Sequence, residues 1–154
     1  MKVFVEKANI DDAELLAEIQ RDSFDDESRT YNNNEPGGPE GYDSIDSQIE
    51  FMKQAHYYKI LKANEIVGGV IVYVNDSLVY NLGRIYINPI HQNQGIGHQV
   101  MKLIEANYPE VQKWWLDTPN WSISNHYFYE KNGYVKIKEE HGLFIYEKCR
   151  SVNC

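Results

Sequence analysis

A glycine-containing turn between a strand-like run and a helix-like run most constrains how this chain can fold. Residues 78–87 are rich in Val, Ile, Leu and Tyr, as in a strand, and residues 98–108 carry apolar side chains at helical spacing. Between these runs lie Pro89 and the segment Gln92-Asn93-Gln94-Gly95-Ile96-Gly97. The first amides of a helix lack intrahelical acceptors and the helix dipole is positive there, so this turn is expected to bind an anion such as a phosphate.

Two common phosphate-binding motifs do not fit this turn. Position 100 is Val100 and not a third glycine, which excludes the dinucleotide fingerprint, and no Gly-Lys-Ser/Thr follows, which excludes a P-loop. Glycines have no Cβ atom, so Gly95 and Gly97 would let a ligand approach the main chain closely. The alternative is that the two glycines only form a tight strand-to-helix connection.

Hydrophobic periodicity predicts the other elements of the fold. Strands are expected at residues 3–6, 57–61, 65–74, 78–87, 111–116, 134–138 and 143–148, and helices at residues 10–24, 44–55, 98–108 and 124–131. The strands between 57 and 87 should form an antiparallel meander, and the third helix should begin at His98, where the glycines end. This order predicts an α/β (α+β) fold of three layers, with helices on both faces of a mixed, mostly antiparallel sheet, in one domain over residues 1–154.

The segment 25–43 carries Pro, Gly and consecutive Asn residues, a composition that disfavours helix and strand alike. We interpret it as a long loop, either a lid that faces the substrate or a mobile insert. The helix that follows is expected to use Ile45, Ile49 and Met52 as its apolar face.

The net charge of the chain limits the classes of molecule that it is expected to bind. The formal net charge is -8, which opposes nucleic-acid binding and favours a cationic substrate. No run of about 18 apolar residues is present, and the N-terminal segment is not that of a signal peptide, so no membrane association is expected. With Cys149 and Cys154 as the only cysteines, the chain has no disulfide framework, and a cytoplasmic location is expected.

Histidine and tryptophan residues are assigned ordinary roles. The histidines show no metal-site spacing with cysteines or carboxylates, so no metal is expected; they are His56, His91, His98, His126 and His141. Trp114, Trp115 and Trp121 cluster around one strand, which favours packing in the core or at a subunit interface over a ligand cage. A homodimer is therefore one assembly to consider.

Two segments of the chain resemble a known family. The first runs from Leu82-Gly83-Arg84 through Asn88-Pro89 to Gln92-Asn93-Gln94-Gly95-Ile96-Gly97 and is similar to the strand, bulge and pyrophosphate loop of the GNAT acetyltransferases, with their Gln/Arg-x-x-Gly-x-Gly/Ala element. The second, Tyr127-Phe128-Tyr129-Glu130-Lys131-Asn132-Gly133-Tyr134, resembles another motif of that family at the expected separation. The resemblance implies the GNAT fold, acetyl-CoA as cosubstrate, and N-acetyltransferase activity.

The resemblance also implies roles for individual residues. The strand residues Ile85, Tyr86 and Ile87 would adjoin the pantetheine arm, with main-chain groups of Ile85 and Ile87 hydrogen-bonded to it. Main-chain amides would hold the pyrophosphate at Gln92, Asn93, Gln94, Gly95, Ile96, Gly97 and His98. Tyr129 would lie near the thioester sulfur, and Asn125, one helical turn earlier, could contact the pantetheine or the adenosine side.

The implied reaction is direct attack of a neutral amine on the thioester. The Ile85 amide would polarise the carbonyl oxygen, and the Tyr129 phenol would protonate the departing thiolate. Many relatives carry a carboxylate where this chain has Asn81, which cannot act as a base. A water chain or a carboxylate of the long loop could replace it, the loop candidates being Glu35, Glu40 and Asp43.

The sequence allows two roles for Arg84, a changed contact at Ser122, and three functions for the chain. Arg84 is either a solvated strand residue or a substrate contact, and Ser122 stands where many relatives have Asn, which could shift a CoA contact to Asn125. The first function is acetylation of a small primary amine. The alternatives are a protein or peptide N-acetyltransferase, and a non-catalytic acyl-CoA-binding module that lacks the Asn81 carboxylate.

Overall fold

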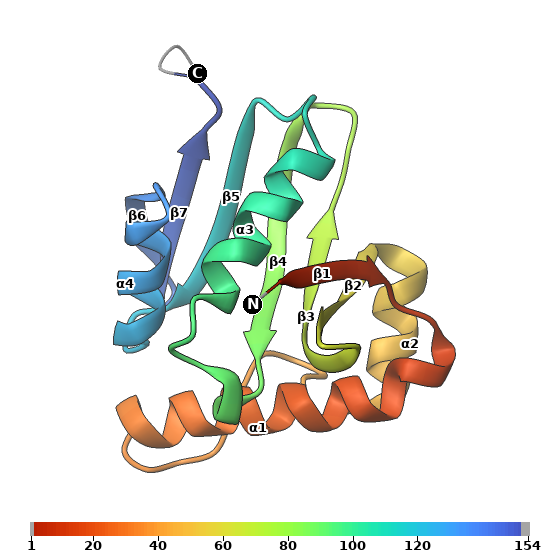
Figure 1. Cartoon of the computed structure of the whole chain (residues 1–154). Helices are drawn as coiled ribbons and strands as arrows, with labels where there is room; N and C mark the ends of the chain where they lie inside the picture. The colour runs from red at the N-terminus through yellow and green to blue at the C-terminus, as the bar shows by residue number, and fades with distance from the viewer. Residues whose placement is uncertain (1, 152–154) are drawn as a thin grey trace.

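The computed structural model describes residues 2–151 and centres on one seven-stranded sheet (Figure 1). The strand order is β1-β2-β3-β4-β5-β7-β6. The strands are β1 (Val3–Lys7), β2 (His56–Lys62), β3 (Glu65–Tyr73), β4 (Val79–Ile87), β5 (Lys113–Pro119), β6 (Val135–Glu140) and β7 (Leu143–Cys149). The expectations that involve Met1 and Cys154 lie outside the described residues.

Pairing in the sheet is antiparallel except between its two middle strands. β2, β3 and β4 form the expected antiparallel meander, whereas β4 and β5 are parallel. The β4–β5 pairing covers only three residue pairs, from Val79↔Lys113 to Asn81↔Trp115. Beyond that point the two strands separate, as Figure 1 shows, so one edge of β4 is unpaired for the rest of its length.

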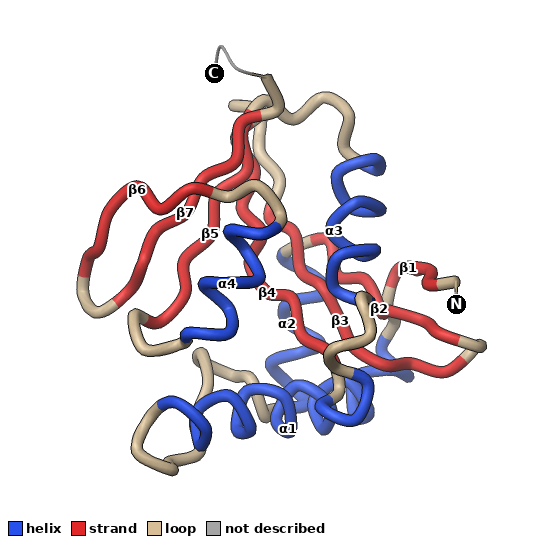
Figure 2. The backbone as a smooth tube through the Cα atoms, turned by 60° about the vertical axis from the view of Figure 1, so that its left-hand side comes forward, coloured by secondary structure: helices blue, strands red, loops and turns tan. Residues whose placement is uncertain are grey.

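Helices cover both faces of the sheet, which confirms the predicted three layers (Figures 1 and 2). The helices are α1 (Ala13–Tyr31), α2 (Ile45–Gln54), α3 (Ile96–Asn107) and α4 (Ile123–Lys131), with short 3-10 turns at Ile10–Asp12 and Pro89–His91. α1 packs on one face in a core with Tyr57, Ile71 and Tyr86. α3 and α4 pack on the other face in a second core that includes Val70 and Leu82. No helix in the described range 2–151 is long and apolar enough to cross a membrane.

Three predicted details of the helices are wrong. α1 does not end near Phe24 but continues to Tyr31. Its last turns are held by polar contacts and not by apolar side chains, and Ser28 is buried there. α3 begins at Ile96, so Gly97 lies inside the helix. In α2 Met52 packs against the core as expected, but Ile45 is 45% exposed and the fully buried side chain is Gln48, since its hydrogen bonds allow a polar group to be buried.

A β-bulge in β4 sets which side chains face each core. Arg84 pairs with Ile71 and Leu82 with Val72, so Gly83 is the extra residue. A Cβ on Gly83 would lie 2.5 Å from the Tyr73 ring, which only glycine avoids. Because the extra residue shifts the alternation by one, β4 turns Tyr86 towards the α1 core and turns Ile85 and Ile87 towards the α3 core.

Candidate active site

The turn before α3 presents a row of main-chain amides without acceptors. Gly95 caps the helix in the left-handed region, with φ 77, and Asn93 also has a positive φ of 62. The first helical hydrogen bond runs from the Gln99 amide to the Gly95 carbonyl, 3.2 Å away. Within the described residues, no hydrogen bond is recorded for the amides of residues 93–98. The Gln92 amide, in contrast, donates to the Pro89 carbonyl at 3.3 Å, so it is not part of this row.

Side chains of the turn brace it against the sheet. Gln92 Nε2 donates to the Ile87 carbonyl at 3.1 Å, which ties the turn to the end of β4. Gln94 Oε1 accepts a hydrogen bond from Lys62 Nζ at 2.6 Å. Lys62, at the end of β2, therefore brings a positive charge to the amide row. No sequence pattern links Lys62 to this turn, because 32 positions separate it from Gln94.

The two glycines of the turn serve different purposes. A Cβ on Gly95 would meet nothing within 4 Å, so this side of the turn is open. A Cβ on Gly97 would lie 2.8 Å from Phe128 Cε1, so Gly97 permits α3 to pack closely against α4. Only Gly95 therefore fits the expected role of exposing the main chain to a ligand.

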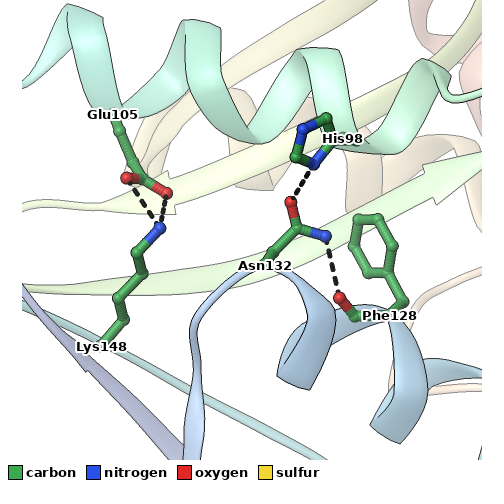
Figure 3. A network of polar contacts seen from close by, with 5 residues as sticks. All are labelled: His98, Glu105, Phe128, Asn132 and Lys148. Atoms are coloured by element: carbon green, nitrogen blue, oxygen red, sulfur yellow. Dashed lines mark hydrogen bonds and ion pairs between the residues drawn. The ribbon is translucent and has the colours of Figure 1, made fainter.

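A polar network joins the first turn of α3 to the end of α4 (Figure 3). Asn132 Nδ2 donates to the Phe128 carbonyl at 2.8 Å, and Asn132 Oδ1 lies 2.7 Å from His98 Nδ1. Because Asn132 Oδ1 can only accept, His98 Nδ1 carries the proton of this bond. The ion pair between Lys148 and Glu105, with N–O distances of 3.0 and 2.9 Å, ties β7 to α3 near by.

The unpaired edge of β4 presents the main-chain groups of Ile85 and Ile87. The Asn88 amide donates to the Val67 carbonyl of β3 at 2.8 Å. Main-chain groups alternate in direction along a strand, so those of Tyr86 also face β3, and those of Ile85 and Ile87 face the gap towards β5. Tyr86 is 2% exposed, and its hydroxyl lies 2.5 Å from that of Tyr57 on the α1 side. Tyr86 therefore points away from the gap.

A cavity of about 460 Å³ occupies the gap between β4 and β5. α1 contributes Phe24, Glu27 and Ser28 to its lining, and the strands contribute residues 83–85 and 117–119. α4 contributes Asn125 and Tyr129, and the loop at residues 36–39 contributes a further wall. The cavity thus joins the α1 side of the sheet to the α4 side.

Tyr129 directs an unpartnered hydroxyl into this cavity. Its side chain is 7% exposed, and no hydrogen bond is recorded for its hydroxyl within residues 2–151. No buried side-chain polar atom of the described residues lacks a partner, so the hydroxyl must be accessible from the cavity. Burial, followed by the nearby carboxylates Asp117 and Glu27, raises the pKa of Tyr129 well above its ordinary value. The phenol therefore keeps its proton at neutral pH.

The carboxylates of the cavity are not those predicted from the loop. Glu35, Glu40 and Asp43 are not among the described residues that line it, whereas Glu27 and Asp117 are. Glu27 lies in the part of α1 that was expected to be loop, and Asp117 follows the predicted end of β5. The alternation of buried Trp114 and Leu116 along β5 was the available signal that Asp117 faces elsewhere.

Asn81 and Ser122 each have a structural contact. Asn81 Nδ2 donates to the Trp115 carbonyl at 3.1 Å, at the last pair before β4 and β5 separate. Ser122 is 1% exposed and donates to Glu27 Oε2, while Ser124 donates to both Glu27 oxygens at 2.6 and 2.8 Å. These bonds hold the start of α4 over the end of α1, as Figure 2 shows.

Arg84 anchors the loop that closes the cavity. Its guanidinium donates to Gln20 Oε1 at 3.0 Å and to the Glu40 carbonyl at 2.6 Å, and it stacks on the Phe51 ring with 4.5 Å to the centroid. Burial lowers the pKa of Arg84. Asp25 holds the same loop by accepting from the Gly37 amide at 3.0 Å and the Tyr42 hydroxyl at 2.7 Å. These hydrogen bonds therefore fix the loop at residues 36–44 against α1 and β4.

The tryptophans divide between core and cavity. Trp114 is 3% exposed and belongs to the α3-side core, as expected. Trp121 instead lines the cavity beside α4, where the sequence favoured packing in the core or at a subunit interface.

Comparison with known proteins identifies the family of the chain. Residues 53–136, more than half of the chain, match a family model described as an acetyltransferase (GNAT) domain. An uncharacterized protein of Bacillus subtilis (strain 168), YrkN, is 38% identical over 88 residues, which are 54% of this chain and 48% of YrkN. The chain thus spans about half the length of that relative.

Solved structures share the fold over nearly the whole chain. The PaiA N-acetyltransferase of Thermoplasma acidophilum in complex with coenzyme A superposes with a TM-score of 0.83 at 18% identity, over 97% of this chain and 99% of that one. An acetyltransferase of Thermus thermophilus gives 0.81 at 15% identity, over 97% of each chain. A GNAT acetyltransferase of Elizabethkingia anophelis with acetyl-CoA bound gives 0.63 at 19% identity, over 96% of this chain and 97% of that one. Because the family model spans the separated strands and the amide turn, and the whole fold agrees, the chain belongs to the GNAT acetyltransferase family.

Proposed function

We propose that this protein is an acetyl-CoA-dependent N-acetyltransferase that transfers an acetyl group to the primary amine of a small molecule. One observation carries the proposal: residues 83–85 on the open edge of β4 and Tyr129 line a single cavity, and the same strand leads into the turn whose main-chain amides at residues 93–98 have no acceptor among the described residues. Membership of the GNAT family supports the reaction class. The related structures with coenzyme A or acetyl-CoA support the choice of cosubstrate.

The proposed cosubstrate site uses three parts of the structure. The amides of residues 93–98 bind the pyrophosphate, because a helix start offers unpaired donors to an anion. Lys62, held at Gln94, adds a positive charge beside them. The outward main-chain groups of Ile85 and Ile87 pair with the amides of the pantetheine arm in the manner of an added strand. Asn125 lies on α4 one turn before Tyr129 and lines the same cavity.

The proposed chemistry places two donors at the thioester. The Ile85 amide polarises the carbonyl oxygen as the acceptor nitrogen attacks, since a fixed donor stabilises the negative charge that develops there. Tyr129 donates its proton to the departing thiolate. The raised pKa of Tyr129 keeps this proton available over the neutral range.

A small acceptor fits the cavity better than a peptide chain. The space is about 460 Å³, and the loop at residues 36–39 closes it on the α1 side. Arg84 and Asp25 brace that loop through hydrogen bonds, so an extended chain would have to displace it. A peptide acceptor is therefore the second outcome to test.

Calorimetric titration of the purified protein with acetyl-CoA, followed by a thiol-release assay, tests the proposal. The assay panel contains a diamine, an amino sugar, a free amino acid and a short peptide with a free N-terminus. We expect binding, and thiol release with one of the small amines. Release with the peptide alone would support a peptide acetyltransferase, and binding without release on any amine would support a non-catalytic acyl-CoA module.

A further inference from the structure

One carboxylate in the cavity has no hydrogen-bond or ion-pair partner among the described residues. Asp117 lies on β5 just beyond the point where β4 and β5 separate, between Leu116 and Thr118, which are both buried. Asp117 itself is exposed and lines the cavity. Within residues 2–151, no hydrogen bond or ion pair is recorded for its side chain. Arg84, the cationic side chain among the described lining residues, is already bound to Gln20 and to the Glu40 carbonyl.

The second carboxylate of the cavity differs from Asp117 in its contacts. Both oxygens of Glu27 accept hydrogen bonds from Ser122 and Ser124. These bonds occupy both carboxylate oxygens and tie Glu27 to the start of α4. Glu27 therefore positions α4.

We propose that Asp117 is the catalytic residue that takes the proton from the ammonium group of the acceptor. This inference rests on the acetyltransferase function proposed above. It stands on geometry: Asp117 opens into the cavity that also holds the unpartnered, 7% exposed Tyr129, and it is unpaired where Glu27 is paired. Many relatives carry a carboxylate on β4 where this chain has Asn81. Here Asp117 supplies the carboxylate from β5, on the other side of the gap.

Electrostatics in the cavity agree with this role. Asp117 is the nearby charge with the largest effect on Tyr129, whose pKa it raises, so the two side chains lie within electrostatic reach of each other. Although the Asp117 side chain is exposed to solvent, partial desolvation by the surrounding cavity walls raises its pKa above the ordinary value. A carboxylate with a raised pKa accepts protons more readily, which suits a general base.

The proton balance closes with these two residues. Asp117 takes one proton from the ammonium, and the neutral nitrogen forms a bond to the thioester carbonyl carbon. The carbon–sulfur bond breaks, and the thiolate takes the Tyr129 proton. The nitrogen then loses its second proton as the amide forms, which restores the Tyr129 phenol, and Asp117 returns its proton to water through the open side of the cavity. One proton is released for each acetyl group transferred.

The test is the pH dependence of thiol release for the wild type and for Asp117→Asn, with the panel amine that the wild type acetylates fastest. We expect kcat/KM of the variant to fall by about 100-fold or more at pH 7.5. We expect it to recover as pH rises towards about 10, where an amine such as that of lysine loses its proton in solution. The wild type should instead show a plateau over the neutral range, and Asp117→Glu should retain part of it.

Two further variants and two further measurements accompany the test. Asp26→Asn removes the same charge from an exposed position of α1 and should change neither rate nor pH profile. Glu27→Gln should lower the melting temperature but keep the plateau. Calorimetry should give the same acetyl-CoA affinity for Asp117→Asn as for the wild type. A carbon-13 titration of the Asp117 carboxyl should give a pKa above the ordinary value of an aspartate.

The outcomes separate this inference from the function on which it rests. If the wild type turns over and Asp117→Asn keeps its rate and plateau, the assignment of Asp117 is wrong and the acetyltransferase function stands. If Glu27→Gln removes the plateau in its place, the proton acceptor is Glu27. If the wild type releases no thiol with any amine, the proposed function itself fails.

Discussion

Gly97 and Phe128 hold α3 and α4 in direct contact, since a Cβ on Gly97 would lie 2.8 Å from Phe128 Cε1. The amide row at the start of α3 and the Tyr129 hydroxyl on α4 are therefore fixed relative to each other by a packing contact as well as by the His98–Asn132 hydrogen bond. Two parts of the proposed site that are distant in the sequence thus behave as one rigid unit.

Gly97→Ala should destabilise the protein by about 1–3 kcal/mol, because the added methyl group overpacks the contact with the Phe128 ring. The measurement is urea unfolding of the wild type and the variant without ligand. In a Phe128→Ala background the same change should cost much less, since the ring is gone. An equal cost in both backgrounds would show that the ring does not limit the helix approach.

Gly95→Ala should weaken acetyl-CoA binding, because its side chain would project from the open side of the amide row. Gly142→Ala is the matched control: the φ angles of Gly95 and Gly142 are 77 and 78, and neither Cβ would meet an atom within 4 Å. Both variants should lose about 1–2 kcal/mol of stability from the left-handed conformation. Calorimetry should show reduced affinity for Gly95→Ala alone, and equal affinity for both variants would contradict the proposed phosphate site.

Tyr129→Phe should lower kcat by about 100-fold and leave acetyl-CoA affinity nearly unchanged, because the hydroxyl donates a proton only in the reaction. Tyr134→Phe serves as the control, since Tyr134 is also buried, packs on Tyr129 with 6.0 Å between ring centroids, and does not line the cavity. Steady-state thiol release and calorimetry are the measurements. A collapse of affinity in Tyr129→Phe would make Tyr129 a structural residue.

Arg84→Lys should loosen the loop at residues 36–44, because lysine cannot bridge Gln20 and the Glu40 carbonyl at the same time. Hydrogen bonds to charged groups contribute about 1.5–3 kcal/mol, so amide exchange in the loop should speed up by about 10-fold or more. The probes are the Gly37 and Tyr42 amides, which are hydrogen-bonded within the loop region. Arg21→Lys, at an exposed ion pair with Asp22, should leave both exchange rates unchanged.

Asp117→Asn should raise the stability of the folded protein at neutral pH. Burial raises the pKa of Asp117, so just above the ordinary aspartate pKa the folded state binds more protons than the unfolded state. The stability of the folded protein therefore falls as the pH rises from the ordinary aspartate pKa through the raised pKa of Asp117. Asp117→Asn removes the charge and should prevent this fall in stability. Melting temperatures at acidic and neutral pH, with Asp26→Asn as reference, measure the effect. A lower melting temperature for Asp117→Asn at neutral pH would reveal a partner that stabilises the carboxylate.

Local patterns predicted the elements well where side-chain periodicity was strong. The meander of β2, β3 and β4, the turn at residues 92–97 and the helix that carries Tyr129 are each specified by neighbours in sequence. The end of α1 was not predicted because its residues are polar: Glu27 is held by hydrogen bonds and Ser28 is buried. Such residues give no periodic pattern of apolar side chains. A polar helix end and a loop look alike when only hydrophobic spacing is available.

The sequence by itself determined the order of the elements, the glycine-containing turn at the start of α3, and the position of Tyr129 one turn after Asn125. The tertiary structure alone decided that β4 and β5 separate after Asn81, that Glu27 and Asp117 meet in the resulting cavity, and that Lys62 reaches Gln94. The physical reason is range: backbone propensities and helix-end amides act over a few residues, whereas the cavity and its charges arise from strand pairing and helix packing between residues 32 to 97 positions apart.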